Sequence, residues 1–211
     1  MKKRRLLYYY LWIILLFSYF IVCGMFLQPP GEIVRGLYSI MTDPSVLVSD
    51  YLEVGGIAAT FINAGLLGII CTAIVMKLDM KPNGSIYLAL FCVFGFGFFG
   101  KNLLNIWPIL TGAYMYSRRK RQPFRNYIVI ALLSTSLAPA VNQIFVLIDG
   151  PTVSAMILSA FSGVMLGFVM PPIPSHCAHL HARPTPPPPP LAPPPPAPPS
   201  PPTPPPPPPP P

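Results

Sequence analysis

In a chain that is otherwise strongly apolar, polar side chains gather between Phe94 and Pro108, where the sequence reads FGFGFFGKNLLNIWP. Glycines permit a helix to break, and the backbone groups that a break exposes can bind a ligand. Beside them, Lys101 supplies a positive charge, and Asn102 and Asn105 supply amide donors and acceptors. Because a charged residue inside a membrane segment usually marks a pathway, these residues predict a binding site for a small polar or anionic solute.

A second interpretation of this stretch stays open. Lys101 can extend its ammonium group to the membrane surface, while the glycines only let neighbouring helices pack closely. The first interpretation describes a transporter or channel-like half that moves a solute. The second describes a non-transporting membrane scaffold or assembly subunit.

The sequence STSLAPAVNQ at residues 134–143 forms a second polar interruption. Asn142 and Gln143 are unfavourable against lipid, so they should face another helix or a cavity. We take these two residues as the second choice for lining the solute site, with hydrogen bonding between helices as the alternative. For Asn63, in an earlier apolar run, we favour that packing role.

Other reactive residues do not form a recognisable catalytic or metal centre. His176, Cys177, His179 and His181 resemble a soft-metal cluster, but the sequence nearby has no carboxylate or second ligand pair. The chain contains no HExxH motif and no serine nucleophile with a credible base. We therefore expect no metal site, no cofactor and no enzymatic activity.

Composition places the supporting elements in a bilayer. Hydrophobic residues make up 52% of the chain and charged residues 9%, and the mean hydropathy is +0.54. A water-soluble globule does not have this composition. The net charge of +8 comes from short basic clusters without an aromatic-basic patch that could stack bases, so nucleic acid is not an expected partner.

Apolar runs of about 20 residues, the length that crosses a bilayer, predict helices at 6–27, 54–76, 127–148 and 152–170. Residues 28–53 carry three prolines and several charges, which suits an aqueous or interfacial connection. Residues 85–117 are too few for two full-width helices and a turn, so this segment must contain something short.

The basic residues orient these helices by the positive-inside rule. If the amino terminus, residues 77–84, residues 118–126 and the segment after 172 are cytoplasmic, twelve of the fourteen basic residues lie inside. This orientation requires residues 85–117 to begin and end on the same side. The sequence therefore predicts either two short spanning helices or a re-entrant hairpin, with both chain termini in the cytoplasm.

The segments DYLEVGGI, FFGKNLLNIWPI, LAPAVNQI and PPIPSHCAHLH are the most specific parts of a wider resemblance. Over residues 1–181, the chain resembles an uncharacterised bacterial membrane family, domain of unknown function 1576. The resemblance implies a polytopic inner-membrane protein and implies no reaction. Members continue past the histidines with more membrane helices, whereas this chain departs at about Ala182, so we expect an amino-terminal half.

Residues 182–211 hold 22 of the 33 prolines. Proline has no backbone donor, so we expect this segment to be a disordered polyproline tail beside a helical domain at 1–181. The whole chain is predicted to be an all-α, multi-pass bundle in the cell membrane with a short or re-entrant broken helix pair. Expected partners are the lipid bilayer, the solute, and either further copies of the chain or the missing carboxy-terminal half.

Overall fold

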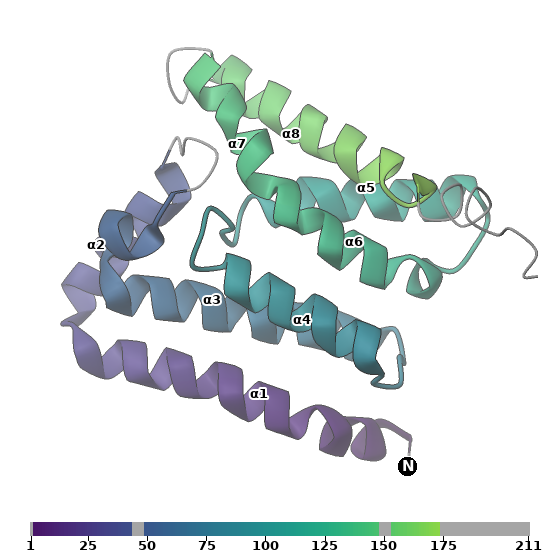
Figure 1. The fold of residues 1–211 in the computed structure, drawn as a ribbon, viewed down its shortest axis with the longest axis horizontal. Helices are drawn as coiled ribbons and strands as arrows, with labels where there is room; N and C mark the ends of the chain where they lie inside the picture. Colours follow the sequence, from purple (N-terminus) through teal and green to yellow (C-terminus); the bar gives the residue numbers. More distant parts are fainter. Residues whose placement is uncertain (1, 44–48, 148–152, 174–211) are drawn as a thin grey trace, which may run out of the picture.

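The computed structural model describes residues 2–43, 49–147 and 153–173, and its regular elements in these ranges are all helical (Figure 1). The prediction of an all-α bundle is confirmed. The predicted proline-rich tail at 182–211 and the histidine group at 176–181 lie outside the described residues. The elements in chain order are α1 (Lys2–Leu27), α2 (Pro30–Thr42), α3 (Tyr51–Lys77), α4 (Gly84–Phe96), α5 (Ile106–Arg119), η1 (Phe124–Asn126), α6 (Ile128–Ser134), η2 (Thr135–Leu137), α7 (Ala138–Leu147) and α8 (Val153–Val169).

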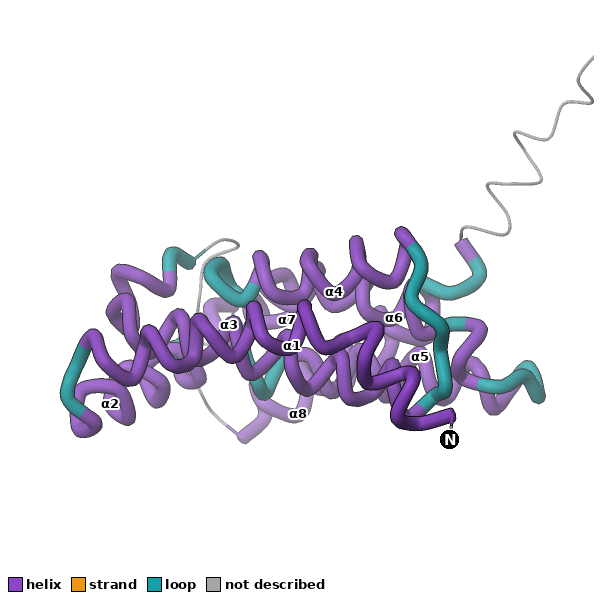
Figure 2. The backbone as a smooth tube through the Cα atoms, turned by 90° about the horizontal axis from the view of Figure 1, so that it is seen from below, coloured by secondary structure: helices purple, strands orange, loops and turns teal. Residues whose placement is uncertain are grey.

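Most of the helices run along one direction, which gives the bundle two distinct ends (Figures 1 and 2). The amino terminus, the α3–α4 connection and the carboxyl end of α5 share one end. This end carries the main lysine and arginine clusters, so we name it the basic end. The α1–α2 connection lies at the opposite end, which we name the α2 end.

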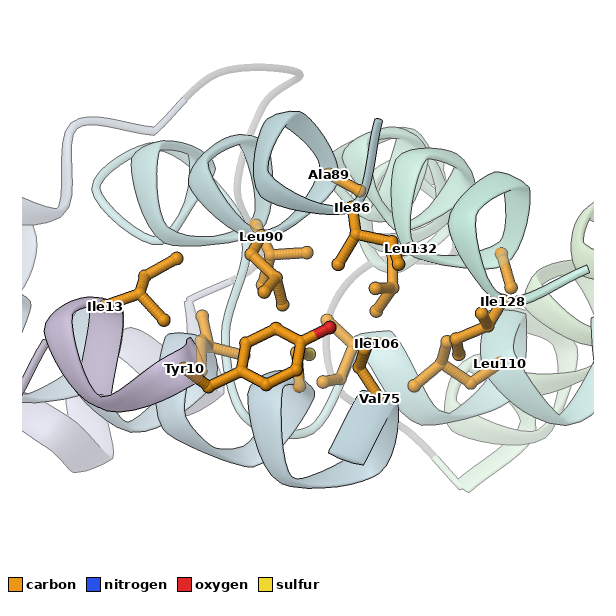
Figure 3. Packing of buried hydrophobic residues seen from close by; sticks show 14 of the residues in the cluster. Tyr10, Ile13, Val75, Ile86, Ala89, Leu90, Ile106, Leu110, Ile128 and Leu132 are labelled. Carbon is orange, nitrogen blue, oxygen red and sulfur yellow. The ribbon is translucent and has the colours of Figure 1, made fainter. Parts of the chain in front are cut away.

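An apolar core joins α1, α3, α4, α5 and α6 (Figure 3). The side chains that meet there include Tyr10, Val75, Leu90, Ile106 and Leu132, one from each of these helices. Because each helix contributes a large buried side chain, the core fixes where α4 and α5 stand relative to α1 and α3.

α1 and α3 are long and apolar enough to cross a membrane, over Leu6–Leu27 and Tyr51–Lys77. On the surface of α1, the side chains of Trp12 and Phe26 are 81% and 87% exposed. The surface of α8 is similar, because Phe161 and its apolar neighbours are exposed as well. Broad apolar surfaces of this kind are typical of contact with lipid or another apolar partner. These helices point to a membrane protein.

α2 occupies part of the segment that the sequence predicted to be a connection. Pro30 stands at the first helical position, where its missing N–H is not needed and its fixed φ suits a helix. Ile33, Gly36 and Ile40 then bury one side of the helix against α3. The sequence predicted a connection here but did not predict the helix within it, because a proline can begin a helix as well as interrupt one.

α3 begins earlier than predicted and bends near its start. The Asp50 carboxylate accepts a hydrogen bond from the Leu52 N–H at 2.9 Å and so caps the helix. Gly56 has φ 78° and ψ 163°, which is a conformation that favours glycine. After the bend, the Ala58 N–H donates to the Gln28 side chain at 3.2 Å. The first turn of α3 therefore leaves the line of the main helix.

α4 and α5 form an antiparallel hairpin that starts and ends toward the basic end (Figure 1). They contain 13 and 14 residues, which correspond to about 20 Å each, against a hydrocarbon core of about 30 Å. The turn between them, residues 97–105, packs on the middle of α3, where a Cβ at Gly97 would lie 2.7 Å from the Cα of Ala64. The hairpin is therefore short, as the sequence predicted.

The predicted helix at 127–148 is divided into α6, η2 and α7. The 3-10 turn η2 lies just before Pro139, which cannot donate the next helical hydrogen bond. α8 then packs on α5 through small residues, and Gly167 lies so close to the Ile109 carbonyl that a Cβ would collide with it. The bend at η2 turns Thr135 and Ser136 toward the tip of the hairpin.

Candidate functional site

The turn at residues 97–105 is held in shape by two asparagine side chains. The side-chain oxygen of Asn102, Oδ1, accepts hydrogen bonds from the backbone N–H groups of Leu104 and Asn105, each at 3.0 Å. In return, the Asn105 side chain accepts from the Asn102 N–H at 2.9 Å and donates to the Gly100 carbonyl at 2.8 Å. These bonds satisfy backbone groups just before α5, which a helix start leaves without partners.

Gly100 makes the reversal possible. Its φ is 73°, a conformation that most side chains adopt only with strain. A Cβ at this position would also lie 2.7 Å from the ring of Pro139 in α7. Glycine at position 100 therefore serves both the turn and its close contact with the bent helix.

Asn63 fastens the turn to α3. Its amide nitrogen donates to the carbonyls of Gly97 and Lys101, at 2.8 and 2.9 Å. The Asn63 side chain is fully buried, and within the described residues its carbonyl oxygen has no hydrogen-bond partner. A buried acceptor in this condition is unfavourable unless a donor reaches it.

Lys101 lies at the tip of the hairpin, and its side chain is 0% exposed. Its Nζ donates to the Thr135 hydroxyl at 2.9 Å and makes a longer contact of 3.5 Å with the Ser136 hydroxyl. The ring centroid of Phe96 is 5.3 Å away, which is within range for a cation–π contact. These partners are all uncharged, so they do not neutralise an ammonium group.

The hairpin tip also contacts the α2 end. The Asn102 amide nitrogen donates to the Ile40 carbonyl at 3.1 Å and to the Tyr51 hydroxyl at 3.3 Å. The Tyr51 N–H donates to the Phe98 carbonyl at 3.1 Å. Tyr51, Asn102 and Lys101 are all buried, so the tip is enclosed by α2, α3 and η2.

The predicted site residues separate into two groups. Lys101, Asn102 and Asn105 lie together in the turn, but the two asparagines direct donors and acceptors to nearby protein groups. Gln143 is half-buried in α7, and the side chain of Asn142 lies outside the described residues. A solute contact for these four amide side chains stays a prediction.

Several residues that touch the turn were not among the predicted site residues. Thr135 and Ser136 belong to the polar interruption at residues 134–143, so their position near Pro139 was a signal for including them in the predicted site. Asn63 has the helix-linking role that we favoured, and its unpartnered oxygen had no signal in the sequence. Tyr51 could not have been found, because its contact with Asn102 spans 51 residues of chain.

Chemically, the arrangement presents an amine inside a structured turn with hydroxyl groups on one side. A buried charge without an opposite charge is strongly unfavourable, so an anion that joined the ammonium group would stabilise it. The hydrogen bonds of the Lys101 ammonium group are separate from those with which Asn102 and Asn105 hold the turn, so the shape of the turn does not depend on them.

Comparison of the sequence with known proteins identifies a family to which the chain belongs. No curated protein and no solved structure matches the chain. Residues 29–183 match the family described as "Protein of unknown function (DUF1576)", a range that contains the hairpin, α2 and all the contacts of Lys101 described above. Because this match covers well over half of the sequence, the chain belongs to the DUF1576 family.

Proposed function

We propose that this protein is a multi-pass integral membrane protein that moves a small polar or anionic solute through a site at Lys101. The observation that carries the proposal is the fully buried Lys101 ammonium group, held at the tip of a short helix hairpin by uncharged partners. Broken helices that meet inside a bundle are a common way to build such a site in transporters.

The orientation follows from the basic end. Anionic lipids and the positive-inside rule favour lysine and arginine on the cytoplasmic side, so the basic end is the cytoplasmic one. The start of α1 and the carboxyl end of α8 both lie at this end (Figure 1). The α2 end then faces outward. In this orientation the α4–α5 hairpin enters the membrane from the cytoplasmic side as a re-entrant loop.

Of the two solute classes, polar and anionic, the structure favours an anion. Among the side chains that the structure describes, Lys101 is the charged one that is fully buried, and its contacts supply dipoles but no negative charge. Taking an ammonium group out of water is unfavourable by several kcal/mol, and a counter-charge recovers much of that energy. A neutral polar solute would recover less.

The test is solute uptake by the purified protein in sealed vesicles. Labelled chloride, formate, phosphate and glycerol are compared in protein-containing and protein-free vesicles. We expect uptake of at least one anion, and its loss in Lys101→Met, because the methionine side chain keeps the volume without the charge. Lys77→Met is the matched control, since Lys77 is an exposed lysine at the end of α3 and should leave uptake unchanged.

Either of two results would contradict the proposal. One is the absence of uptake for every probe by a folded wild-type protein. The other is an uptake rate that Lys101→Met leaves unchanged, which would place the solute elsewhere.

The competing function is a membrane scaffold or assembly subunit. It is favoured by the glycine contacts between helices, such as Gly65 against the Phe17 carbonyl of α1, where a Cβ would lie 2.7 Å from the oxygen. In that case the wild-type protein shows no uptake. Bulky substitutions at Gly65 or Gly68 would then impair its assembly, whereas Lys101→Met would not.

A further inference from the structure

The contacts of Asn102 link the Lys101 turn to a separate layer of the protein. This layer consists of α2 and the first turn of α3, residues 51–55, and we name it the cap. Ile40 is in the last turn of α2, where a helix leaves carbonyl groups without internal partners. Asn102 donates to that carbonyl and to the Tyr51 hydroxyl, so one amide group joins both parts of the cap.

A second contact lies beside this one. The Tyr51 N–H donates to the Phe98 carbonyl at 3.1 Å, and Asp50 and Phe99 form an isolated antiparallel bridge. The Tyr51 side chain is 0% exposed. The cap therefore covers the hairpin tip on the side that faces the α2 end, directly over the residues next to Lys101.

The first turn of α3, which belongs to the cap, joins the rest of α3 through a bend. At Gly56 the backbone leaves helical geometry, with φ 78°. The Thr60 hydroxyl bridges the bend by contacting the carbonyls of Tyr51 at 2.7 Å and Gly56 at 2.8 Å. The Gln28 side chain accepts from the Ala58 N–H, just after the bend. Side chains thus complete the hydrogen bonding that a continuous helix would have supplied from its backbone.

Within the cap, α2 rests on the first turn of α3 through glycine. A Cβ on Gly36 would collide with the Gly55 carbonyl, so the two backbones are in direct contact. On the other side of α2, Val34 and Tyr38 are 67% and 68% exposed. α2 also packs on α3 beyond the bend, where Ile33 lies with Ala58 and Ile62, and packed helices can slide past one another by small amounts.

We propose that the cap is a gate on the α2 side of the Lys101 site, closed in this structure and latched by Asn102. This inference rests on the proposed function for its biological purpose, but the movement itself can be tested without a solute. Opening breaks the bonds from Asn102 to Ile40 and Tyr51, and the Gly56 bend absorbs the change in backbone direction. Asn105 and Asn63 keep the turn in shape while the cap moves.

The test measures how fast a thiol at position 101 reacts with a membrane-impermeant methanethiosulfonate added on the α2 side of sealed vesicles. Lys101→Cys is made in a background in which the native cysteines are replaced by serine. Those native cysteines are Cys23, Cys71, Cys92 and Cys177. In this reference protein we expect slow labelling, because the closed cap covers the position.

Two variants should open the gate. Gly36→Val forces α2 away from the Gly55 carbonyl and from Ala59, which lies beyond the bend and outside the cap. We expect labelling at least about tenfold faster, since packing conflicts of this kind exceed the energy of one hydrogen bond. Tyr51→Phe keeps the ring but removes one acceptor of Asn102, and we expect an increase of about two- to tenfold. If Gly36→Val fails to fold, Tyr51→Phe still decides the question.

Each variant has a matched control in the cap. Gly31→Val places the same side chain at a position with nothing within 4 Å of the new Cβ. Tyr38→Phe removes a hydroxyl from an exposed tyrosine of α2. Both controls should label at the reference rate.

The proposal of a gate would be overturned if the thiol at position 101 of the reference protein were labelled as fast as an exposed thiol, such as that of Tyr38→Cys. It would equally be overturned if neither Gly36→Val nor Tyr51→Phe changed the rate. Failure of the proposed function gives a different pattern, in which the cap still controls labelling but no probe anion is taken up. Conversely, uptake that needs Lys101 with labelling that ignores the cap would reject the gate alone.

Discussion

The apolar core near the basic end and the hairpin tip are held together in different ways. In the core, Tyr10, Val75 and Leu132 come from separate helices and meet through their hydrocarbon surfaces (Figure 3). At the tip, Asn63 and Asn105 bond backbone groups over a few ångströms. The core thus depends on the fit between side chains, and the tip depends on the completeness of its hydrogen bonds.

This difference between packing and hydrogen bonding has consequences for a protein that is surrounded by lipid. In a bilayer, apolar side chains gain little by leaving lipid for protein, so close packing must hold the helices together. Unpaired polar groups are unfavourable there, because no water replaces a lost partner. It follows that the asparagines are required for the shape of the tip, while Lys101 contributes charge to a turn that other residues already hold.

The largest effect should come from disturbing the packed helices. Gly65→Leu places a side chain where the Cβ alone would lie 2.7 Å from the Phe17 carbonyl, so α1 and α3 must separate. We expect destabilisation of about 3 kcal/mol or more, measured as a fall in the free energy of unfolding in detergent micelles. Gly95→Leu is the control, since nothing lies within 4 Å of a Cβ there, and an equal loss in both would refute the packing argument.

Next in size is the loss of a turn-forming amide. Asn105→Ala leaves the Asn102 N–H and the Gly100 carbonyl without their partners in a buried turn. With about 1 to 3 kcal/mol for each of the two unsatisfied groups, we expect destabilisation of about 2 to 6 kcal/mol. Asn126→Ala, at an exposed position in η1, should change stability by less than about 0.5 kcal/mol. Equal, small changes in both variants would show that the amide bonds do not support the turn.

Local sequence was enough to predict where the hairpin turns. The glycines, Lys101 and the asparagines marked the break between residues 94 and 108, and the number of residues in 85–117 ruled out two full-width helices. These features depend on residues that are near each other in the chain.

The cap could not be predicted in the same way. Asn102 meets Ile40 and Tyr51 across 62 and 51 residues of chain, and no periodic pattern encodes which distant carbonyl an amide will reach. Similarly, Thr135 was part of a polar interruption, but only the packing of η2 on the hairpin identifies it as the acceptor for Lys101. Long-range pairing of single polar groups was the information that the sequence lacked.

A smaller effect separates the two roles at the tip. Thr135→Val keeps the shape of the side chain and removes the short acceptor of the Lys101 Nζ. We expect destabilisation of about 1 to 2 kcal/mol, because hydrogen bonds to charged groups are stronger than average but Ser136 can take over part of the contact. Ser117→Ala, which removes a hydroxyl bonded only to its own helix, is the control for hydroxyl loss in unfolding measurements. A Thr135→Val change no larger than this control would show that the hydroxyl does not hold the ammonium group.

The smallest change in stability should come from Lys101 itself. Replacing a buried charge by an apolar side chain of similar volume is often neutral or stabilising, so Lys101→Met should lie within about 1 kcal/mol of wild type. In the Lys101→Met background, Thr135→Val should then lose most of its own effect, because the charge that needed the hydroxyl is gone. Unfolding of the four proteins in this double-mutant cycle measures that coupling directly. If Lys101→Met instead destabilises the protein as strongly as Asn105→Ala, the lysine belongs to the structural framework of the turn, and its burial would no longer favour a solute site.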